Sequence, residues 1–248
     1  MRNNLLYTKE ERDSLRHTKI FNDTNKIWND YSHNKRTNIG TISYLLRSAH
    51  NLFCGNTSNL MTFEQWEMFY LRSGAKRAEL LSNSSDLTKE EITKIDLYYG
   101  RTIQDIHKIT EAFKKSLDEN GYKISYSKVF NYCYIRIVDE AYIGYKREYN
   151  TLHSLREVFP DYQFDFADDY DDVQLGIDIM VQKNGKLVGG FQVKSDIYRD
   201  SDRTYNIDAK NVNNKKFKRC KKEKGFTPKY IYVDRTGKVS EPYPDLKF

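Results

Sequence analysis

The chain has 248 residues, and its 41 Lys and Arg against 35 Asp and Glu give a formal net charge of +6. Hydrophobic residues make up 38% and charged residues 31%, which is typical of a globular protein with a real core. No segment approaches the roughly 18 apolar residues of a membrane span. The opening MRNNLLYTKEERD has no apolar stretch long enough for a signal peptide. We therefore expect a cytoplasmic protein without membrane association.

The number and spacing of the cysteines argue against a fold stabilised by disulfide bonds or by a structural zinc ion. Cys54, Cys133 and Cys220 are an odd number, lie far apart and show no CxxC spacing. A disulfide framework and a structural zinc site are therefore both disfavoured. The mild net charge is uninformative alone, so the position of the basic residues matters more than their number.

The first part of the chain is predicted to be helical. Early helices are expected over about 9–31 and 40–53. Thr62-Phe-Glu-Gln65 and Thr88-Lys-Glu-Glu91 fit capping boxes, each followed by apolar residues at helical spacing. After the second box one helical face carries Ile92, Ile95, Tyr99, Ile106, Phe113 and Leu117. Asn120-Gly121 then ends that segment.

From about residue 133 the pattern changes to a mixture of helices and short strands. A helix at 137–159 precedes three strands and is followed by a Lys-rich helix and a last strand. The strands are predicted at 162–167, 176–182, 187–194 and 229–234, and the second helix at 208–224. The order αβββαβ indicates an α/β (α+β) fold with a mixed sheet. We assign residues 1–132 to a helical region and residues 133–248 to this core.

One carboxylate lies within the apolar stripe of the predicted helix 137–159. Glu148 fills the single gap in the stripe Ala141, Tyr145, Leu152, Leu155 and Phe159. A buried carboxylate is costly unless it has a partner, a metal ion or a raised pKa. The alternative is that the stripe is wide and Glu148 reaches solvent or pairs with an Arg.

The strands carry a second group of polar residues. Asp178 interrupts the apolar run GIDIMV, whereas Gln192 and Lys194 lie two apart in FQVKS and so share one strand face. A two-residue turn at Asn184-Gly185 places Asp178 on the other face.

Two irregularities would restore a common face for these residues. One is a three-residue turn with a bulge at Gly185, and the other is a bulge at Gly189-Gly190. Either one brings Asp178, Gln192 and Lys194 together.

Such a cluster suits phosphodiester hydrolysis. Asp178, the Gln192 side-chain oxygen and the Val193 carbonyl are oxygen ligands of the kind that Mg²⁺ prefers. Lys194 can hold the attacking water or steady the charge on the phosphate, and Glu148 can reach the metal through a water. The alternative is a hairpin with surface charges, but the helix–strand–hairpin context with a buried acid makes the pattern specific.

These residues resemble the PD-(D/E)XK nuclease superfamily, with Gln192 where the family more often has Glu or Asp. The chain is most similar to type II restriction endonucleases of the MjaI kind. The segments that carry this resemblance are GYKRE (144–148), DDYDDVQ (168–174), GID (176–178) and FQVKSDIY (191–198). TFEQWEMFY (62–70) is compatible with it.

The resemblance implies site-specific cleavage of double-stranded DNA by a homodimer that depends on Mg²⁺, with Mn²⁺ able to substitute. It also leaves room for a cognate DNA methyltransferase encoded nearby. Two alternatives remain open. One is a structure-specific repair or recombination nuclease, which could be phage-encoded, and the other is an inactive DNA-binding protein on the same core, which Gln192 favours.

Two charged segments flank the predicted site. The acidic run Asp168, Asp169, Asp171 and Asp172 is either a solvated loop or the source of a further metal ligand, with Asp172 the best placed. The basic helix 208–224 either is simply solvated or contacts DNA phosphates. Its candidate residues for DNA contact are Lys215, Lys216, Lys218, Arg219, Lys221 and Lys222.

Overall fold

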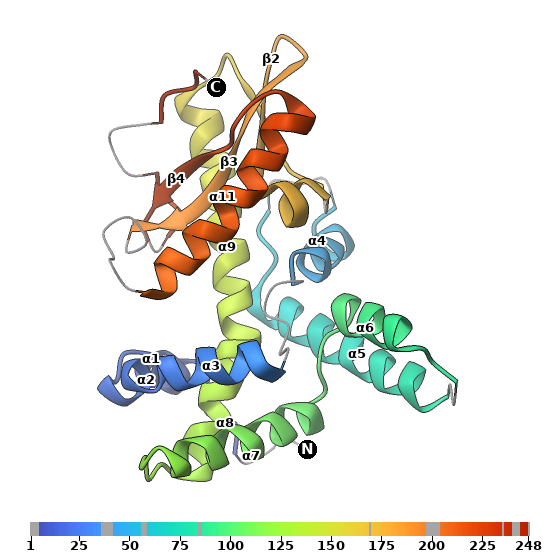
Figure 1. Cartoon of the computed structure of the whole chain (residues 1–248), viewed down its shortest axis with the longest axis vertical. Helices are drawn as coiled ribbons and strands as arrows, with labels where there is room; N and C mark the ends of the chain where they lie inside the picture. The colour runs from blue at the N-terminus through green and yellow to red at the C-terminus, as the bar shows by residue number, and fades with distance from the viewer. Residues whose placement is uncertain are drawn as a thin grey trace. The chain divides into compact units, whose positions relative to one another are not determined.

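We describe the fold from a computed structural model of the chain (Figure 1). The structure describes residues 5–35, 42–55, 59–83, 86–168, 170–196, 204–234, 236–239 and 244–247. The chain divides into two compact units, Met1–Tyr142 and Ile143–Phe248, so residues 133–142 pack with the helical unit. The two units are described separately below.

The described residues of the first unit form helices joined by turns and short loops, with no strand among them, as expected. Its helices are α1 (Lys9–Arg16), α2 (Lys19–Asp23), α3 (Asn25–Lys35), α4 (Ile42–Phe53), α5 (Phe63–Ser82), α6 (Lys89–Tyr98), α7 (Ile103–Glu119) and α8 (Tyr126–Tyr134), followed by a π-helical turn, η1 (Ile135–Asp139). The segment expected at 9–31 is three short helices, because Thr18 caps a new helix directly after α1. The start of the segment expected at 40–53 lies outside the described residues, which begin again at Ile42.

The capping boxes at Thr62 and Thr88 are confirmed, but the continuous helix predicted after Thr88 is wrong. The chain breaks between α6 and α7, where Thr102 and Asp105 form another capping box. A Cβ on Gly100 would stand 2.2 Å from the Tyr70 carbonyl oxygen, so this segment approaches α5 backbone to backbone. Ile106, Phe113 and Leu117 are buried as predicted, whereas Ile92 is exposed.

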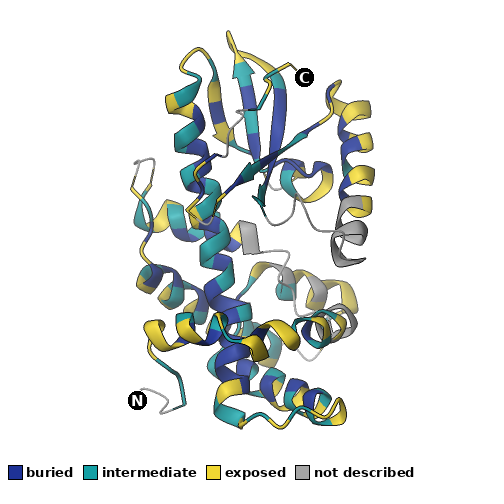
Figure 2. Cartoon of the chain, turned by 90° about the vertical axis from the view of Figure 1, so that its left-hand side faces the viewer, coloured by how far each residue is buried: buried dark blue, intermediate teal, exposed yellow. Residues whose placement is uncertain are grey.

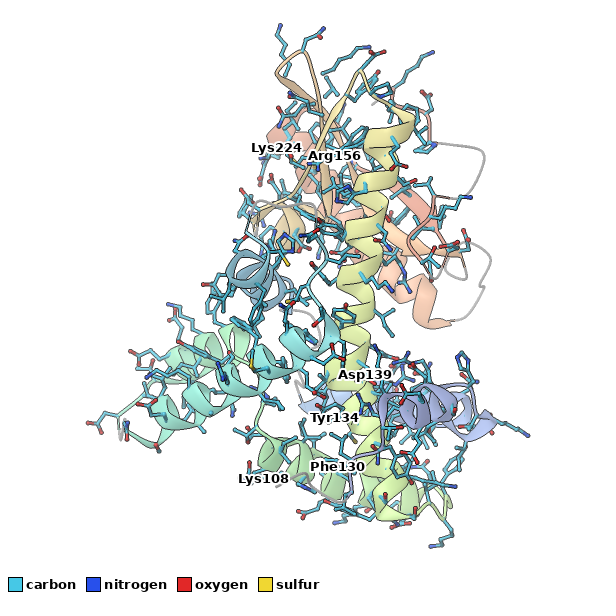
Figure 3. The ribbon with its side chains drawn as sticks, turned by 180° about the vertical axis from the view of Figure 1, so that it is seen from behind. Lys108, Phe130, Tyr134, Asp139, Arg156 and Lys224 are labelled. Carbon is cyan, nitrogen blue, oxygen red and sulfur yellow. The ribbon has the colours of Figure 1, made fainter. Side chains whose placement is uncertain are left out.

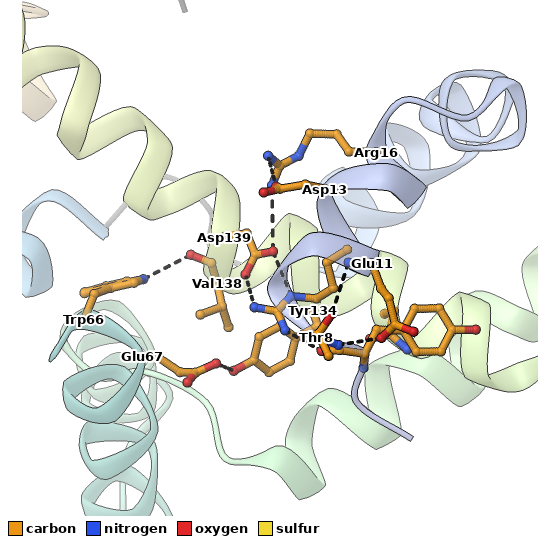
Figure 4. Close-up of polar contacts among 12 residues, drawn as sticks. Thr8, Glu11, Asp13, Arg16, Trp66, Glu67, Tyr134, Val138 and Asp139 are labelled. Atoms are coloured by element: carbon orange, nitrogen blue, oxygen red, sulfur yellow. Dashed lines mark hydrogen bonds and ion pairs between the residues drawn. The ribbon is translucent and has the colours of Figure 1, made fainter. Parts of the chain in front are cut away.

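A buried ion pair ties the N-terminal helix to the π-helical turn of the same unit. Arg12 Nε lies 2.9 Å from Asp139 Oδ2, and both side chains are almost fully buried. Figure 4 shows the surrounding contacts, which include Trp66 Nε1 donating to the Val138 carbonyl at 3.0 Å. Burial raises the pKa of Asp139 although the Arg12 guanidinium opposes this shift. The pair therefore exists at the cost of desolvating two charges.

The second unit is a four-stranded mixed sheet between two helices (Figure 1). Its elements are α9 (Glu140–Val158), β1 (Gln163–Phe166), the π-helical turn η2 (Asp171–Leu175), β2 (Ile179–Lys183), β3 (Lys186–Ser195), α11 (Thr204–Lys224) and β4 (Lys229–Val233). The strand order is β1-β2-β3-β4, with β1, β2 and β3 antiparallel and β4 parallel to β3. The predicted order αβββαβ is confirmed, although the first helix continues unbroken from α8 through η1.

The two faces of the sheet pack against different helices. On one face the α9 residues Leu152 and Leu155 share a core with Ile179, Phe191 and Ile231. On the other face the α11 residue Cys220 packs with residues such as Ile177 and Met180. Figure 2 shows buried residues along the strands and exposed residues on the outer side of α11. Arg156 of α9, labelled in Figure 3, also donates to the Phe164 carbonyl of β1, with Nε at 3.0 Å.

The hairpin between β2 and β3 has the two-residue turn at Asn184-Gly185, which without a bulge would place Asp178 on the face opposite Gln192. Lys183 pairs with Lys186 around Asn184-Gly185, and both turn residues have positive φ, as a type I′ turn requires. The register then shifts by one residue between Val181 and Gln182. This bulge restores the common face, so the second of the two expected irregularities is present, close to the predicted Gly189-Gly190.

None of the described helices combines the length and apolar composition that crossing a bilayer requires.

Replacing Asp139 with Ala leaves the Arg12 charge buried without its partner. We expect the free energy of unfolding to fall by about 3 kcal/mol or more. The control is Asp13→Ala, because Asp13 is half-exposed and pairs with Arg16 within one helix. That variant should lose under ~1 kcal/mol. Urea denaturation of both variants measures the difference, and equal losses would show that the buried pair has no special weight.

Candidate active site

Asp178 directly precedes β2, and it forms the last hydrogen bonds between this segment and β3. Its backbone N–H donates to the Phe191 carbonyl at 2.8 Å, and its carboxylate Oδ2 accepts the Val193 N–H at 2.6 Å. The carboxylate thus takes the place that a strand carbonyl would otherwise occupy. Beyond Phe191, β3 continues with β4 as its only partner in the described ladders. Because no described residue of β2 pairs with β3 past Phe191, the sheet has an opening beside Asp178.

Gln192 and Lys194 lie on β3 at this opening. Phe191 and Val193 point into the α9 core, so Gln192 and Lys194 point to the opposite face, beside Asp178. The structure therefore brings together the three residues that the sequence placed in one cluster.

The Gln192 side chain holds an unused acceptor. It is only 6% exposed, and within the described residues its Oε1 accepts no hydrogen bond. A buried carbonyl oxygen without a donor is costly unless something else approaches it. In a strand, the N–H and the C=O of one residue point to the same side. The Val193 N–H points to Asp178. The Val193 carbonyl therefore also faces the opening, and three oxygen donors converge there.

In the described part of the acidic run before Asp178, Asp171 and Asp172 begin the π-helical turn η2. The Asp168 carboxylate accepts the Asp171 N–H at 2.8 Å, and Asp171 is buried against Lys224, labelled in Figure 3, at 3.0 Å. Gly176 ends η2 in the left-handed conformation with φ 72°, which releases the chain toward Asp178. Asp172 lies near enough to Asp178 to act on its charge. Asp169 lies outside the described residues.

Burial is the main influence on the Asp178 carboxyl group and raises its pKa to about 6. Lys194 and Lys216 oppose this shift with their positive charges, and the Val193 N–H opposes it with its hydrogen bond. Asp172 adds to the shift through like-charge repulsion. A divalent cation at the opening would remove the cost of ionising Asp178, so the raised pKa fits an acid that works with a cation.

Glu148 comes from the opposite face of the sheet. The Arg147 backbone packs closely against Gly237, which lies in the turn that follows β4, and the Thr151 hydroxyl donates to the Gly237 carbonyl. Val233, the last residue of β4, pairs with Ser195 at the end of β3. Glu148 therefore lies at the end of the sheet where Lys194 is, although α9 packs on the other side. Among the described residues no three Asp, Glu, His or Cys side chains form a metal-binding group. A ready triad of Glu148, Asp172 and Asp178 is thus not present.

The basic residues of α11 play different parts. Arg219 binds Glu223, Gln174 and the Tyr170 hydroxyl, and Lys221 Nζ donates to the Gly225 carbonyl. Both are therefore engaged in holding the turn and the helix end. Lys215, Lys218 and Lys222 are exposed and follow one another at spacings of three and four, so they form one solvent-facing stripe.

Three neighbours of the cluster were not predicted from the sequence. Tyr230 and Tyr232 of β4 pair in register with Gln192 and Lys194, so they share that face. The alternation KYIYVD signals the pairing, but not which strand lies next to β4. Lys216 was expected only as a DNA-binding residue, because a helix pattern does not show which of its residues approaches a strand end.

Replacing Asp178 with Asn should stabilise the metal-free protein at neutral pH. Because the folded pKa of about 6 exceeds the unfolded value of about 4, the wild type loses stability as pH rises from 4 through 6. Asn keeps an acceptor for Val193 without the charge, so we expect a gain of about 2 kcal/mol at pH 7 that vanishes below pH 4. Thermal melting in EDTA from pH 4 to 8 measures it.

The exposed Asp161 supplies the control for that measurement. Asp161→Asn should melt like the wild type at every pH. A pH profile for Asp178→Asn that parallels the wild type would show that Asp178 ionises without cost.

Comparison with known proteins identifies the family of the chain. A family model described as MjaI restriction endonuclease matches residues 18–238, which is well over half of the chain. No curated protein and no solved structure matches the chain significantly. The matched range includes Asp178, Gln192 and Lys194 as well as most of the helical unit. The chain therefore belongs to the MjaI restriction endonuclease family, whose members are nucleases that act on DNA.

Proposed function

We propose that this protein is a type II restriction endonuclease that hydrolyses both strands of double-stranded DNA at a specific site with Mg²⁺. The observation that carries the proposal is the opening beside Asp178, where a carboxylate, an orphaned amide oxygen, a strand carbonyl and a lysine converge. This is the arrangement expected of a PD-(D/E)XK core.

The donor set fits a hard divalent cation. Asp178, Gln192 Oε1 and the Val193 carbonyl offer oxygens, and Mg²⁺ prefers a few protein oxygens with retained waters. Gln192 Oε1 is the strongest sign, because it is buried without a hydrogen-bond donor among the described residues. When bound there, Mg²⁺ would polarise the phosphate and lower the pKa of a water, and Mn²⁺ should substitute.

The other residues prepare the phosphodiester for attack. The Val193 N–H and the surrounding protein hold the Asp178 carboxylate in one position. Lys194, on the same face, places positive charge where the attacking water meets the phosphate. Glu148, at the same end of the sheet, can hold a water on the far side of the cluster. In the reaction the water oxygen bonds to phosphorus, one P–O ester bond breaks, and the leaving oxygen takes a proton.

The exposed stripe of α11 gives the DNA backbone a place to bind. Lys215, Lys218 and Lys222 span about 10 Å along the helix. Phosphates of one DNA strand recur about every 3.4 Å along the duplex axis, so the stripe can contact more than one of them. Such contacts would position the duplex without reading its sequence. A cognate DNA methyltransferase encoded nearby belongs to the same proposal, since a restriction enzyme endangers unprotected host DNA.

One observation favours a second candidate, an inactive DNA-binding protein. Gln192 is neutral where a carboxylate would draw the cation more strongly, so the site carries less negative charge. The two candidates separate in one assay, because the inactive protein would retard DNA in a gel without cutting it.

Digestion of a plasmid and a phage genome with Mg²⁺ should give discrete bands, and excess EDTA should abolish them. Asp178→Ala and Lys194→Ala should lose cleavage by about 100-fold or more while still binding DNA, and Glu148→Gln should lose a smaller part. Lys238→Ala, an exposed residue of the turn after β4, is the control. A smear would favour a nonspecific or structure-specific nuclease. Cleavage that persists in EDTA would contradict the proposal.

We also propose that two copies of the chain act together. One core holds one scissile phosphate, so cutting both strands most simply needs two cores on a two-fold symmetric site. Light scattering of the protein on its DNA site should therefore give a protein mass of twice the 29.5 kDa chain. A single chain per DNA duplex throughout cleavage would rule out this arrangement.

A further inference from the structure

Lys216 differs from the other basic residues of α11 in its surroundings. It is only partly exposed, whereas its neighbours Lys215 and Lys218 are exposed. It makes no hydrogen bond and no ion pair within the described residues, while Arg219 and Lys224 of the same helix are both held by acids. Among the described residues the Lys216 ammonium is thus held by no hydrogen bond or ion pair, and it acts on its surroundings through its charge.

Gly176 makes room for the Lys216 side chain. A Cβ built on Gly176 would stand 3.3 Å from Lys216 Cδ and 3.5 Å from Lys216 Cβ. The aliphatic stem of Lys216 therefore lies along the backbone just two residues before Asp178. The ammonium at the end of this stem is near enough to stabilise the charge of the Asp178 carboxylate.

The position follows from how α11 packs on the sheet. Phe217 and Cys220 are buried, and the Phe217 ring lies 5.2 Å from the Tyr230 ring of β4. Tyr230 pairs in register with Gln192. These contacts fix α11 over the sheet face that bears the cluster. On the helix, Lys216 therefore points toward Gly176, and the exposed stripe points away from the sheet.

We propose that Lys216 is a second catalytic cation, which contacts a nonbridging oxygen of the scissile phosphate while Lys194 serves the attacking water. The inference rests on the proposed function and deepens it. In the metal-free protein Lys216 partly neutralises Asp178. If Asp178 held a divalent cation, the Lys216 ammonium would be repelled from the carboxylate, and its flexible stem would let it turn to the incoming phosphate.

The role is electrostatic and moves no proton. As water attacks, negative charge builds on the nonbridging oxygens, and an ammonium held in a partly buried site stabilises that charge more than it stabilises the bound DNA. The exposed stripe instead contacts phosphates equally before and during the reaction. Loss of Lys216 should therefore slow cleavage, whereas loss of the stripe should weaken binding.

The test compares Lys216→Gln with the adjacent Lys215→Gln in the full-length protein. Plasmid cleavage is measured with enzyme in excess and Mg²⁺ at saturation, and DNA affinity is measured without divalent cation over a range of salt. Lys216→Gln should cut about 100-fold more slowly and bind within about threefold of wild type. Lys215→Gln should instead weaken binding, with affinity and salt dependence reduced by one phosphate contact. Lys186→Gln, at the exposed start of β3, should match the wild type in both measurements.

Lys216→Arg guards against a purely structural explanation, because it keeps the charge on a stem of similar length. It should recover part of the lost rate, and both Lys216 variants should melt within a few degrees of wild type. A wild-type rate for Lys216→Gln would overturn the inference, as would equal losses of rate and affinity that match those of Lys215→Gln. If the wild-type protein itself cuts no DNA, the proposed function fails first.

Discussion

The acceptor contact between the Asp178 carboxylate and the Val193 N–H is the interaction on which the candidate site depends. It replaces a rung of the β2–β3 ladder, and so it holds a charged group at the point where the sheet opens. The carboxylate cannot leave without exposing a buried N–H, and it cannot ionise cheaply without a cation. A cation bound there would lower the cost of ionising Asp178, while the Val193 N–H would still hold the carboxylate in place. The buried acid therefore fits the proposed catalytic role.

Other features of the second unit keep this contact in register. The bulge after the tight turn sets Asp178 on the face of Gln192 and Lys194, and the left-handed Gly176 directs the chain out of η2. Lys224 anchors the turn by pairing with buried Asp171. These contacts all lie within the second unit.

Local patterns in the sequence predicted most of the elements and the membership of the cluster. Strand alternation showed that Gln192 and Lys194 share a face, and the glycines near the hairpin showed that a bulge could bring Asp178 to it. The choice between turn and bulge depends on packing of both sheet faces, which no local pattern contains. The break before Thr102 was missed because Asp105 replaces the usual Glu or Gln of a capping box. Lys216 was missed as a site residue because its role depends on where α11 lies over Gly176.

We propose that Asp178, Gln192 and Val193 form a cation site. Crystals soaked in Mn²⁺, with diffraction collected at the manganese absorption edge, test it most directly. The account predicts an anomalous peak bound by the Asp178 carboxylate, Gln192 Oε1 and the Val193 carbonyl, and no peak there in Asp178→Asn. Manganese bound elsewhere in the chain, with the Gln192 oxygen accepting a protein hydrogen bond instead, would contradict it.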